Sequence, residues 1–153
     1  VDVSMGYVIN PPYYFLTEGI GFNIIMVEDY GVNMYADVLF TTDELISKNP
    51  ELVRNFVQAT LDGWQYVVEN EDEALTITMR YATDKSIAHE MYGLRKSIPL
   101  INTGDVLIGI MNERGWQNVH KSLLVINPDV SQMNVSDCYT TQFVDNPNEW
   151  HKV

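Results

Sequence analysis

The sequence predicts an α/β protein, and three observations support this fold class. Short apolar runs rich in Val, Ile and Phe, which are typical of buried strands, occur within the first 41 residues. A long amphipathic helix with clear start and stop signals follows over residues 49–70. Helical patterns then dominate the remainder, so strands come early and helices come late.

The early part of the chain alternates strand patterns with short connections. We expect strands over residues 1–9, 22–27 and 38–41, the first stopped by Pro11 and Pro12 and the second introduced by Gly21. One helical turn is expected over residues 12–17, ending near Gly19. Residues 28–35 form the crossover between the second and third strands.

The central helix is the best-defined element of the sequence. Asn49 is a natural N-cap, Pro50 suits the first helical position, and Glu51 faces the positive end of the helix. We expect one face of this helix to pack on a sheet and the other to face water. The expected buried face comprises Leu52, Val53, Phe56, Val57, Leu61, Trp64, Val67 and Val68.

Cap residues place the other helices. Thr41 or Thr42 can cap a short helix over residues 43–47, and Asn70 can begin one over residues 72–81. A helix over residues 86–97 is expected to stop at Pro99. Asn112 is expected to cap residues 113–124, and Ser136 to cap a short helix ending near residue 144.

Composition excludes several functional classes. The chain has 153 residues, 46% of them hydrophobic, which suits one domain with one core. A formal charge of −12 with nine Lys and Arg residues argues against nucleic acid and anionic membranes as partners.

The chain begins at Val1 inside a strand pattern, so we expect a fragment or an excised domain. Cys138 is alone, and a small buried hydrophobe is its favoured role.

Catalytic and metal-binding motifs are missing from the sequence. His89, His120 and His151 are far apart, and none stands in a metal-ligand spacing. No nucleophile elbow, phosphate loop or dinucleotide fingerprint occurs, and no spacing identifies a pair of catalytic carboxylates. We therefore expect no enzyme activity, no metal and no cofactor.

Aromatic residues cluster in the first 35 residues, interleaved with Asn10 and Asn33. Two interpretations stay open, because such rings form either core or the walls of a ligand pocket with polar groups that orient the ligand. Phe15 is assigned to the core. Tyr7, Asn10, Tyr30 and Tyr35 are the candidate ligand-binding residues. The aromatic cluster is Tyr7, Tyr13, Tyr14, Phe15, Tyr30 and Tyr35.

Several segments together resemble one known family. They are VDVSMGYVINPP, the long stretch from DYGVNMYADVLFTT through the central helix, LIGIMNERGWQNVHKSLL and TTQFVDNP. The chain resembles the C-terminal half of periplasmic (type II) substrate-binding proteins of ABC transporters. The branch is that of thiamine-pyrimidine-precursor binders and the related nitrate, sulfonate and taurine binders.

The resemblance implies a two-lobed, periplasmic binding protein-like α/β fold that closes over a small molecule. Residues 1–27 would end the second lobe, residues 28–35 would be the hinge crossover with Gly31 absorbing backbone change, and residues 36–153 would be the C-terminal half of the first lobe. The family's first half, with many ligand contacts, is absent, so exposed sheet edges could drive homodimerisation.

One motif departs from the family. The resembling proteins have Asn-Glu-Pro where this chain has Asn10-Pro11-Pro12. The family carboxylate suits hydrogen bonds from an aminopyrimidine, so its loss weakens the expectation for that ligand. Asn10 still offers its amide.

Three functions are therefore weighed. The leading one is a bacterial solute-binding protein, periplasmic or membrane-anchored outside the cell, that delivers a small, pyrimidine-like molecule to an ABC permease. The second is the extracytoplasmic sensor domain of a diguanylate cyclase or histidine kinase, which the full gene would reveal. The third, an enzyme of pyrimidine synthesis, is disfavoured because the Cys-rich motif and active-site His of the fungal relatives are not recognisable here.

Overall fold

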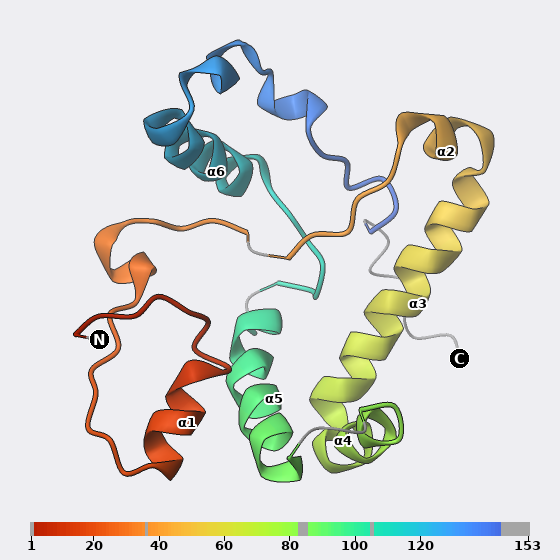
Figure 1. The fold of residues 1–153 in the computed structure, drawn as a ribbon. Helices are drawn as coiled ribbons and strands as arrows, with labels where there is room; N and C mark the ends of the chain where they lie inside the picture. Colours follow the sequence, from red (N-terminus) through yellow and green to blue (C-terminus); the bar gives the residue numbers. More distant parts are fainter. Residues whose placement is uncertain (1, 36, 83–85, 105, 145–153) are drawn as a thin grey trace. The chain divides into compact units, whose positions relative to one another are not determined.

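The computed structural model describes residues 2–35, 37–82, 86–104 and 106–144 (Figure 1). Its contacts divide the chain into two compact units, one of residues 1–23 and 61–108 and the other of residues 24–60 and 109–153. The helical elements are α1 (Pro11–Thr17), η1 (Val27–Tyr30), α2 (Asp43–Lys48), α3 (Pro50–Glu69), α4 (Glu71–Met79), α5 (Ile87–Ile101), α6 (Glu113–Ile126), η2 (Pro128–Gln132) and η3 (Val135–Asp137). Among the described residues, none of these helices is long and apolar enough to cross a bilayer.

The expected strands do not form in the part of the chain that the structure describes. Residues 2–7, 20–26 and 38–42 carry no strand assignment, so the strand predictions over residues 1–9, 22–27 and 38–41 are wrong for the described positions. Residue 1 lies outside the described residues. The physical reason is that a strand cannot satisfy its own backbone groups and needs a neighbour, whereas a helix pairs them internally.

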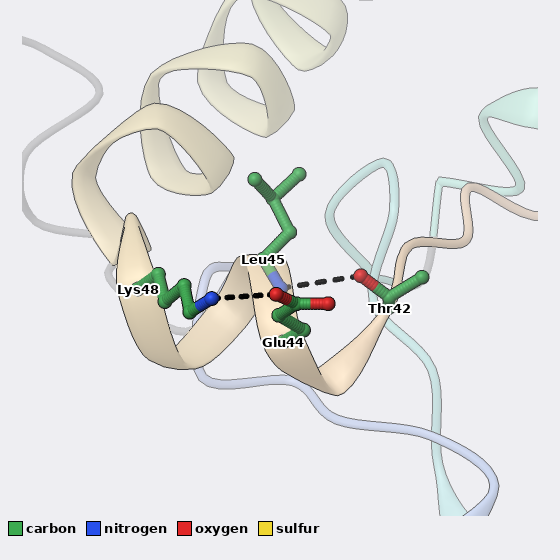
Figure 2. Close-up of polar contacts among 4 residues, drawn as sticks. All are labelled: Thr42, Glu44, Leu45 and Lys48. Atoms are coloured by element: carbon green, nitrogen blue, oxygen red, sulfur yellow. Dashed lines mark hydrogen bonds and ion pairs between the residues drawn. The ribbon is translucent and has the colours of Figure 1, made fainter.

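The first turn of α2 shows why the chain enters a helix at Asp43. The Thr42 hydroxyl accepts a hydrogen bond from the Leu45 amide at 3.2 Å, so Thr42 is the cap (Figure 2). Lys48 Nζ lies 2.6 Å from Glu44 Oε1 one turn away, an exposed pair that adds only a few tenths of a kcal/mol (Figure 2). The cap is the stronger of these two local effects.

The central helix α3 confirms the predicted boundaries. The Asn49 carbonyl accepts the first helical bond from the Val53 amide at 3.3 Å. Asn70 stops the helix, because its side-chain amide donates to the Tyr66 carbonyl at 3.1 Å and no side-chain cap of α4 is formed.

The predicted packing face is only partly covered. Val53 and Leu61 are buried, Val57, Val67 and Val68 are half-buried, and Leu52, Phe56 and Trp64 are exposed. No sheet exists in the described residues to cover the rest of that face.

In the unit of residues 1–23 and 61–108, aromatic contacts join α1 to α5. The buried His89 ring lies 4.7 Å from the Tyr13 ring and 5.0 Å from the Tyr14 ring, measured between centroids. Tyr13 also contacts Tyr92, one turn after His89, at 5.6 Å. Phe15 packs on Phe22 at 5.4 Å and is half-buried, which agrees with its predicted core role. These rings, rather than a sheet, fix α1 in its unit.

Two predictions about helix ends need correction. The helix α5 continues past Pro99 to Ile101, because the Asn102 amide reaches the Ile98 carbonyl at 2.9 Å and the proline removes only one amide donor. Ser136 lies inside the short turn η3 instead of capping a helix to residue 144. The carboxylate of Asp137 accepts local bonds from Asn134 and Ser136, which compete with helix formation. The part of the resembling C-terminal segment beyond residue 144 lies outside the described residues.

Cys138 is exposed, so its prediction as a buried hydrophobe is wrong. Its thiol lies 3.6 Å from the Asn134 carbonyl in the turn that η3 forms. The turn holds the Cys138 side chain at the surface. A single cysteine in the sequence does not reveal this exposure.

The α2 cap gives the first testable prediction. Replacing Thr42 with Ala removes the acceptor of the Leu45 amide and should lower the free energy of unfolding by about 1 kcal/mol. Urea denaturation followed by circular dichroism measures this loss. Thr41→Ala is the matched control and should change stability by less than about 0.5 kcal/mol. Equal losses in both variants would show that Thr42 is not the cap.

The junction of α3 and α4 gives a prediction about pH. A hydrogen bond to the Glu73 side chain raises the pKa of Tyr66 above its usual 10.0, with desolvation and the negative charge of Glu73 adding to the effect. The folded chain therefore holds this proton more tightly than the unfolded chain. Its stabilising contribution is complete below pH 10 and is lost as the pH rises through the raised value.

Titration of ring-labelled tyrosines by NMR checks this assignment. Tyr66 should ionise above its usual pKa of 10.0, and Glu73→Gln should return its midpoint toward that value. Asp72→Asn removes the same charge from the neighbouring position and should leave most of the shift in place. A normal Tyr66 midpoint in the unmodified chain would contradict the contact.

Candidate functional site

Two of the predicted ligand residues lie in one turn. The backbone N–H of Asn10 donates to the Tyr7 carbonyl at 3.1 Å. The backbone carbonyl of Asn10 accepts from the Tyr13 N–H at 3.1 Å, where α1 begins. Both side chains are exposed. Asn10 stands at the N-cap position, but its side chain forms no cap hydrogen bond. No other described residue forms a hydrogen bond with its side-chain amide. The turn thus presents an aromatic ring and an uncommitted amide three residues apart.

Tyr30 and Gly31 belong to the other unit, at the end of η1. Tyr30 is exposed. Gly31 closes the turn in the left-handed conformation, with φ 82° and ψ 8°, and its amide donates to the Glu28 carbonyl at 3.0 Å. A side chain at this φ would be strained, which explains the glycine. Its hinge role stays a prediction.

Tyr35 is half-buried and takes part in a contact network of its own unit. Its hydroxyl accepts a hydrogen bond from the Asn112 amide at 3.0 Å, where α6 begins. Its ring lies 5.6 Å from the Trp116 ring, which in turn stacks on Tyr139 at 5.3 Å with the planes 10° apart. Asn112 itself caps α6 by accepting from the Gly115 amide at 2.9 Å, as predicted. A ligand role for Tyr35 stays a prediction, while its structural role is visible.

The sequence did not single out Trp116 and Tyr139 as partners of Tyr35. Trp116 follows the helix cap Asn112 by four positions, which places it on the second turn of α6. This spacing from the cap could have identified Trp116 as a residue near the start of the helix. Tyr139 lies in an irregular segment and has no such signal. The indole nitrogen of Trp116 is buried without a hydrogen-bond partner among the described residues.

Other parts of this unit are also held by ring contacts. The Arg54 guanidinium lies 5.6 Å from the centre of the buried Phe143 ring, on the N-terminal part of α3. His120 Nε2 lies 2.8 Å from the Val130 carbonyl and ties α6 to η2. The contact with Val130 gives His120 a structural role.

Two shallow hollows lie in the unit of residues 1–23 and 61–108. One of about 400 Å³ is lined by Gln65, Asn102, Gly104, Val106, Leu107 and Ile108. The other, of about 450 Å³, lies over residues 68–73 with Arg95, which forms a 3.2 Å ion pair with Glu71. Neither contains a predicted ligand residue. Among the described residues, no group of three or more His, Cys, Asp and Glu side chains could hold a metal.

Comparison with known proteins adds independent information. Residues 1–74 match the family model described as NMT1/THI5 like. The riboflavin-binding protein RibY of Chloroflexus aurantiacus is 25% identical over 150 residues, which cover 94% of this chain and 42% of that protein. The formylaminopyrimidine-binding protein of Halalkalibacterium halodurans is 34% identical over 80 residues, which cover 51% of this chain and 24% of that protein. No solved structure matches the chain significantly.

The two relatives belong to one class of protein, the solute-binding proteins. Both relatives are named as binding proteins and neither as an enzyme, in agreement with the prediction of a non-enzymatic protein. The chain is related to the NMT1/THI5-like branch of substrate-binding proteins, so the resemblance found in the sequence is confirmed. The chain spans less than half the length of these relatives. The division into lobes stays a prediction.

The contact between Tyr35 and α6 yields a matched pair of glycine substitutions. A methyl group on Gly115 would overlap the Tyr35 ring, approaching its Cε2 within 2.6 Å, whereas one on Gly63 in α3 would meet nothing within 4 Å. Both glycines are helical. Gly63→Ala should therefore stabilise the chain by about 0.5–1 kcal/mol through helix propensity.

Gly115→Ala should have the opposite sign and destabilise the chain by about 1–3 kcal/mol, because Tyr35 must move away from α6. Urea denaturation of both variants measures the difference. Stabilisation of the Gly115 variant to the same extent as the Gly63 variant would show that Tyr35 does not pack there in solution.

Proposed function

We propose that this chain is part of an extracytoplasmic solute-binding protein whose ligand is a small heteroaromatic molecule held at the turn of Tyr7 and Asn10. One observation carries the proposal: an exposed aromatic ring and a side-chain amide without a hydrogen-bond partner among the described residues stand in the same turn. A ring face and a few orienting polar groups are what a planar heterocycle needs for binding. The ligands for which the two relatives are named, riboflavin and a formylaminopyrimidine, support this ligand class.

The chemistry of Asn10 favours a flavin-like ring over an aminopyrimidine. The amide group can donate to a ring carbonyl and accept from a ring N–H, which matches the imide edge of a flavin. Amino substituents on a pyrimidine call for a strong acceptor such as a carboxylate, and Pro11 stands where the resembling proteins carry Glu. Riboflavin, the ligand named for one relative, is therefore the proposed model ligand.

The proposed physiological role rests on the resemblance to substrate-binding proteins of ABC transporters. We propose that the complete protein works outside the cytoplasm and delivers its ligand to an ABC permease. Signalling through a fused output domain is the alternative. Ligand binding precedes either output, so the binding site is tested first.

Ligand choice is the first test. The chain should be titrated with riboflavin and with a formylaminopyrimidine, alone and mixed with the part of RibY that lies outside the matched segment. Riboflavin fluorescence should be quenched saturably at one site in the mixture, with at least tenfold tighter binding than the formylaminopyrimidine, a difference of about 1.4 kcal/mol. Absence of saturable riboflavin binding in every sample would contradict the proposed ligand.

Side-chain substitutions test the site itself. Tyr7→Ala removes one stacking face and should weaken riboflavin binding about tenfold, within the range of ring stacking on aromatic side chains. Tyr81→Ala removes another exposed ring of the same unit, 85% exposed against 68% for Tyr7, and is the control. Asn10→Ala should reduce the preference for riboflavin, whereas Asn23→Ala should not. Equal affinities of the Tyr7 and Tyr81 variants would reject the Tyr7 assignment.

A further inference from the structure

Helix α5 carries a glycine at the point where it approaches the turn of Tyr7 and Asn10. Gly93 lies in the middle of this helix, where glycine is less favourable than alanine. It is not among the glycines with a positive φ, so backbone freedom does not account for it. A methyl group at this position would lie 3.3 Å from the Ile9 carbonyl oxygen, closer than an ordinary van der Waals contact. The glycine therefore makes room for the backbone of the turn.

The Ile9 carbonyl belongs to the peptide group that closes the turn. Because a peptide group is planar, the Ile9 carbonyl and the Asn10 N–H move together. That N–H donates to the Tyr7 carbonyl at 3.1 Å, and this hydrogen bond sets the position of Tyr7 relative to Asn10. The Ile9 carbonyl accepts no backbone hydrogen bond from another described residue. Its packing on α5 is therefore what limits its position.

Ring contacts hold the helix after the turn on the same face of the unit. Tyr92, the neighbour of Gly93, contacts Tyr13 with ring centroids 5.6 Å apart, and His89 contacts Tyr13 at 4.7 Å. Figure 1 shows α1, which carries Tyr13, beside α5. Helix α5 is thus the common support of α1 and of the turn that precedes it.

We propose that Gly93 is a positioning residue of the ligand site, because its missing side chain lets α5 hold the Ile9 carbonyl and thereby the geometry of Tyr7 and Asn10. This inference rests on the proposed function, in which that turn contacts the ligand. Adding a methyl group at Gly93 pushes the Ile9 oxygen away from α5 and tilts the Asn10 N–H. The substitution changes the turn without removing either ligand-binding side chain.

Two-dimensional amide NMR of the chain without ligand tests the contact itself. In Gly93→Ala, the backbone amide resonance of Asn10 should shift more than that of any other residue outside α5. Gly63→Ala is the matched control, because Gly63 is a helical glycine of the same unit whose added methyl group would meet nothing within 4 Å. It should leave the Asn10 resonance in place. An unmoved Asn10 resonance in Gly93→Ala would overturn the proposal.

Riboflavin affinity and stability, measured together, separate positioning from a purely structural role. With the part of RibY outside the match present, Gly93→Ala should bind riboflavin about fivefold more weakly. Its urea midpoint should change by less than about 0.5 M, because better helix propensity offsets the displaced backbone. Leu75→Val, at a buried position of α4 in the same unit, should lower the urea midpoint and keep the affinity.

The two readouts fail in different ways. A shifted Asn10 resonance with unchanged riboflavin affinity in Gly93→Ala would overturn the positioning role, as would parallel losses of affinity and stability in both variants. Absence of riboflavin binding to the unmodified chain would contradict the proposed function, whereas the shift of the Asn10 resonance would still support the hold of Gly93 on the turn.

Discussion

Backbone amides and carbonyls need hydrogen-bond partners, and this requirement decides which parts of the chain are regular. Each α-helix meets the requirement within its own segment, and caps such as Thr42 and Asn112 complete the first turns. Strand-like segments must find a neighbour, and those of this chain have none among the described residues. Helices α2 and α3 therefore form within one residue of their predicted boundaries, while apolar residues such as Phe40 stay in water.

With no sheet in the described residues, ring contacts do much of the packing in both units. In one unit His89 contacts Tyr13 and Tyr14. In the other, Trp116 contacts the tilted ring of Tyr35 and stacks on Tyr139. The aromatic residues of the first 35 positions therefore have different roles. Tyr13 and Tyr35 are engaged within the chain, whereas Tyr7 and Tyr30 remain exposed and available for a ligand.

Local signals predicted local structure well. Asn49, Pro50 and Asn70 gave the bounds of α3 within one residue, since caps and proline act over a single turn. Strands and burial depend on partners distant in sequence, so apolar runs at residues 22–27 and 38–41 could not show whether those partners were present. For the site, the sequence brought Tyr7 and Asn10 into one motif, but nothing in it disclosed that Tyr139 stacks on Trp116, the ring that contacts Tyr35. Pro11 stands in that motif where the resembling proteins carry Glu, so the sequence left the ligand open.

The central claim is that the turn of Tyr7 and Asn10 contacts a planar heterocycle. The most direct measurement is a two-dimensional amide NMR titration with riboflavin, using the labelled chain mixed with the part of RibY outside the match. The account predicts saturable shifts that include the Tyr7 backbone amide and the Asn10 side-chain amide, with a common binding constant. Shifts that avoid this turn, or no saturable shifts at all, would contradict it.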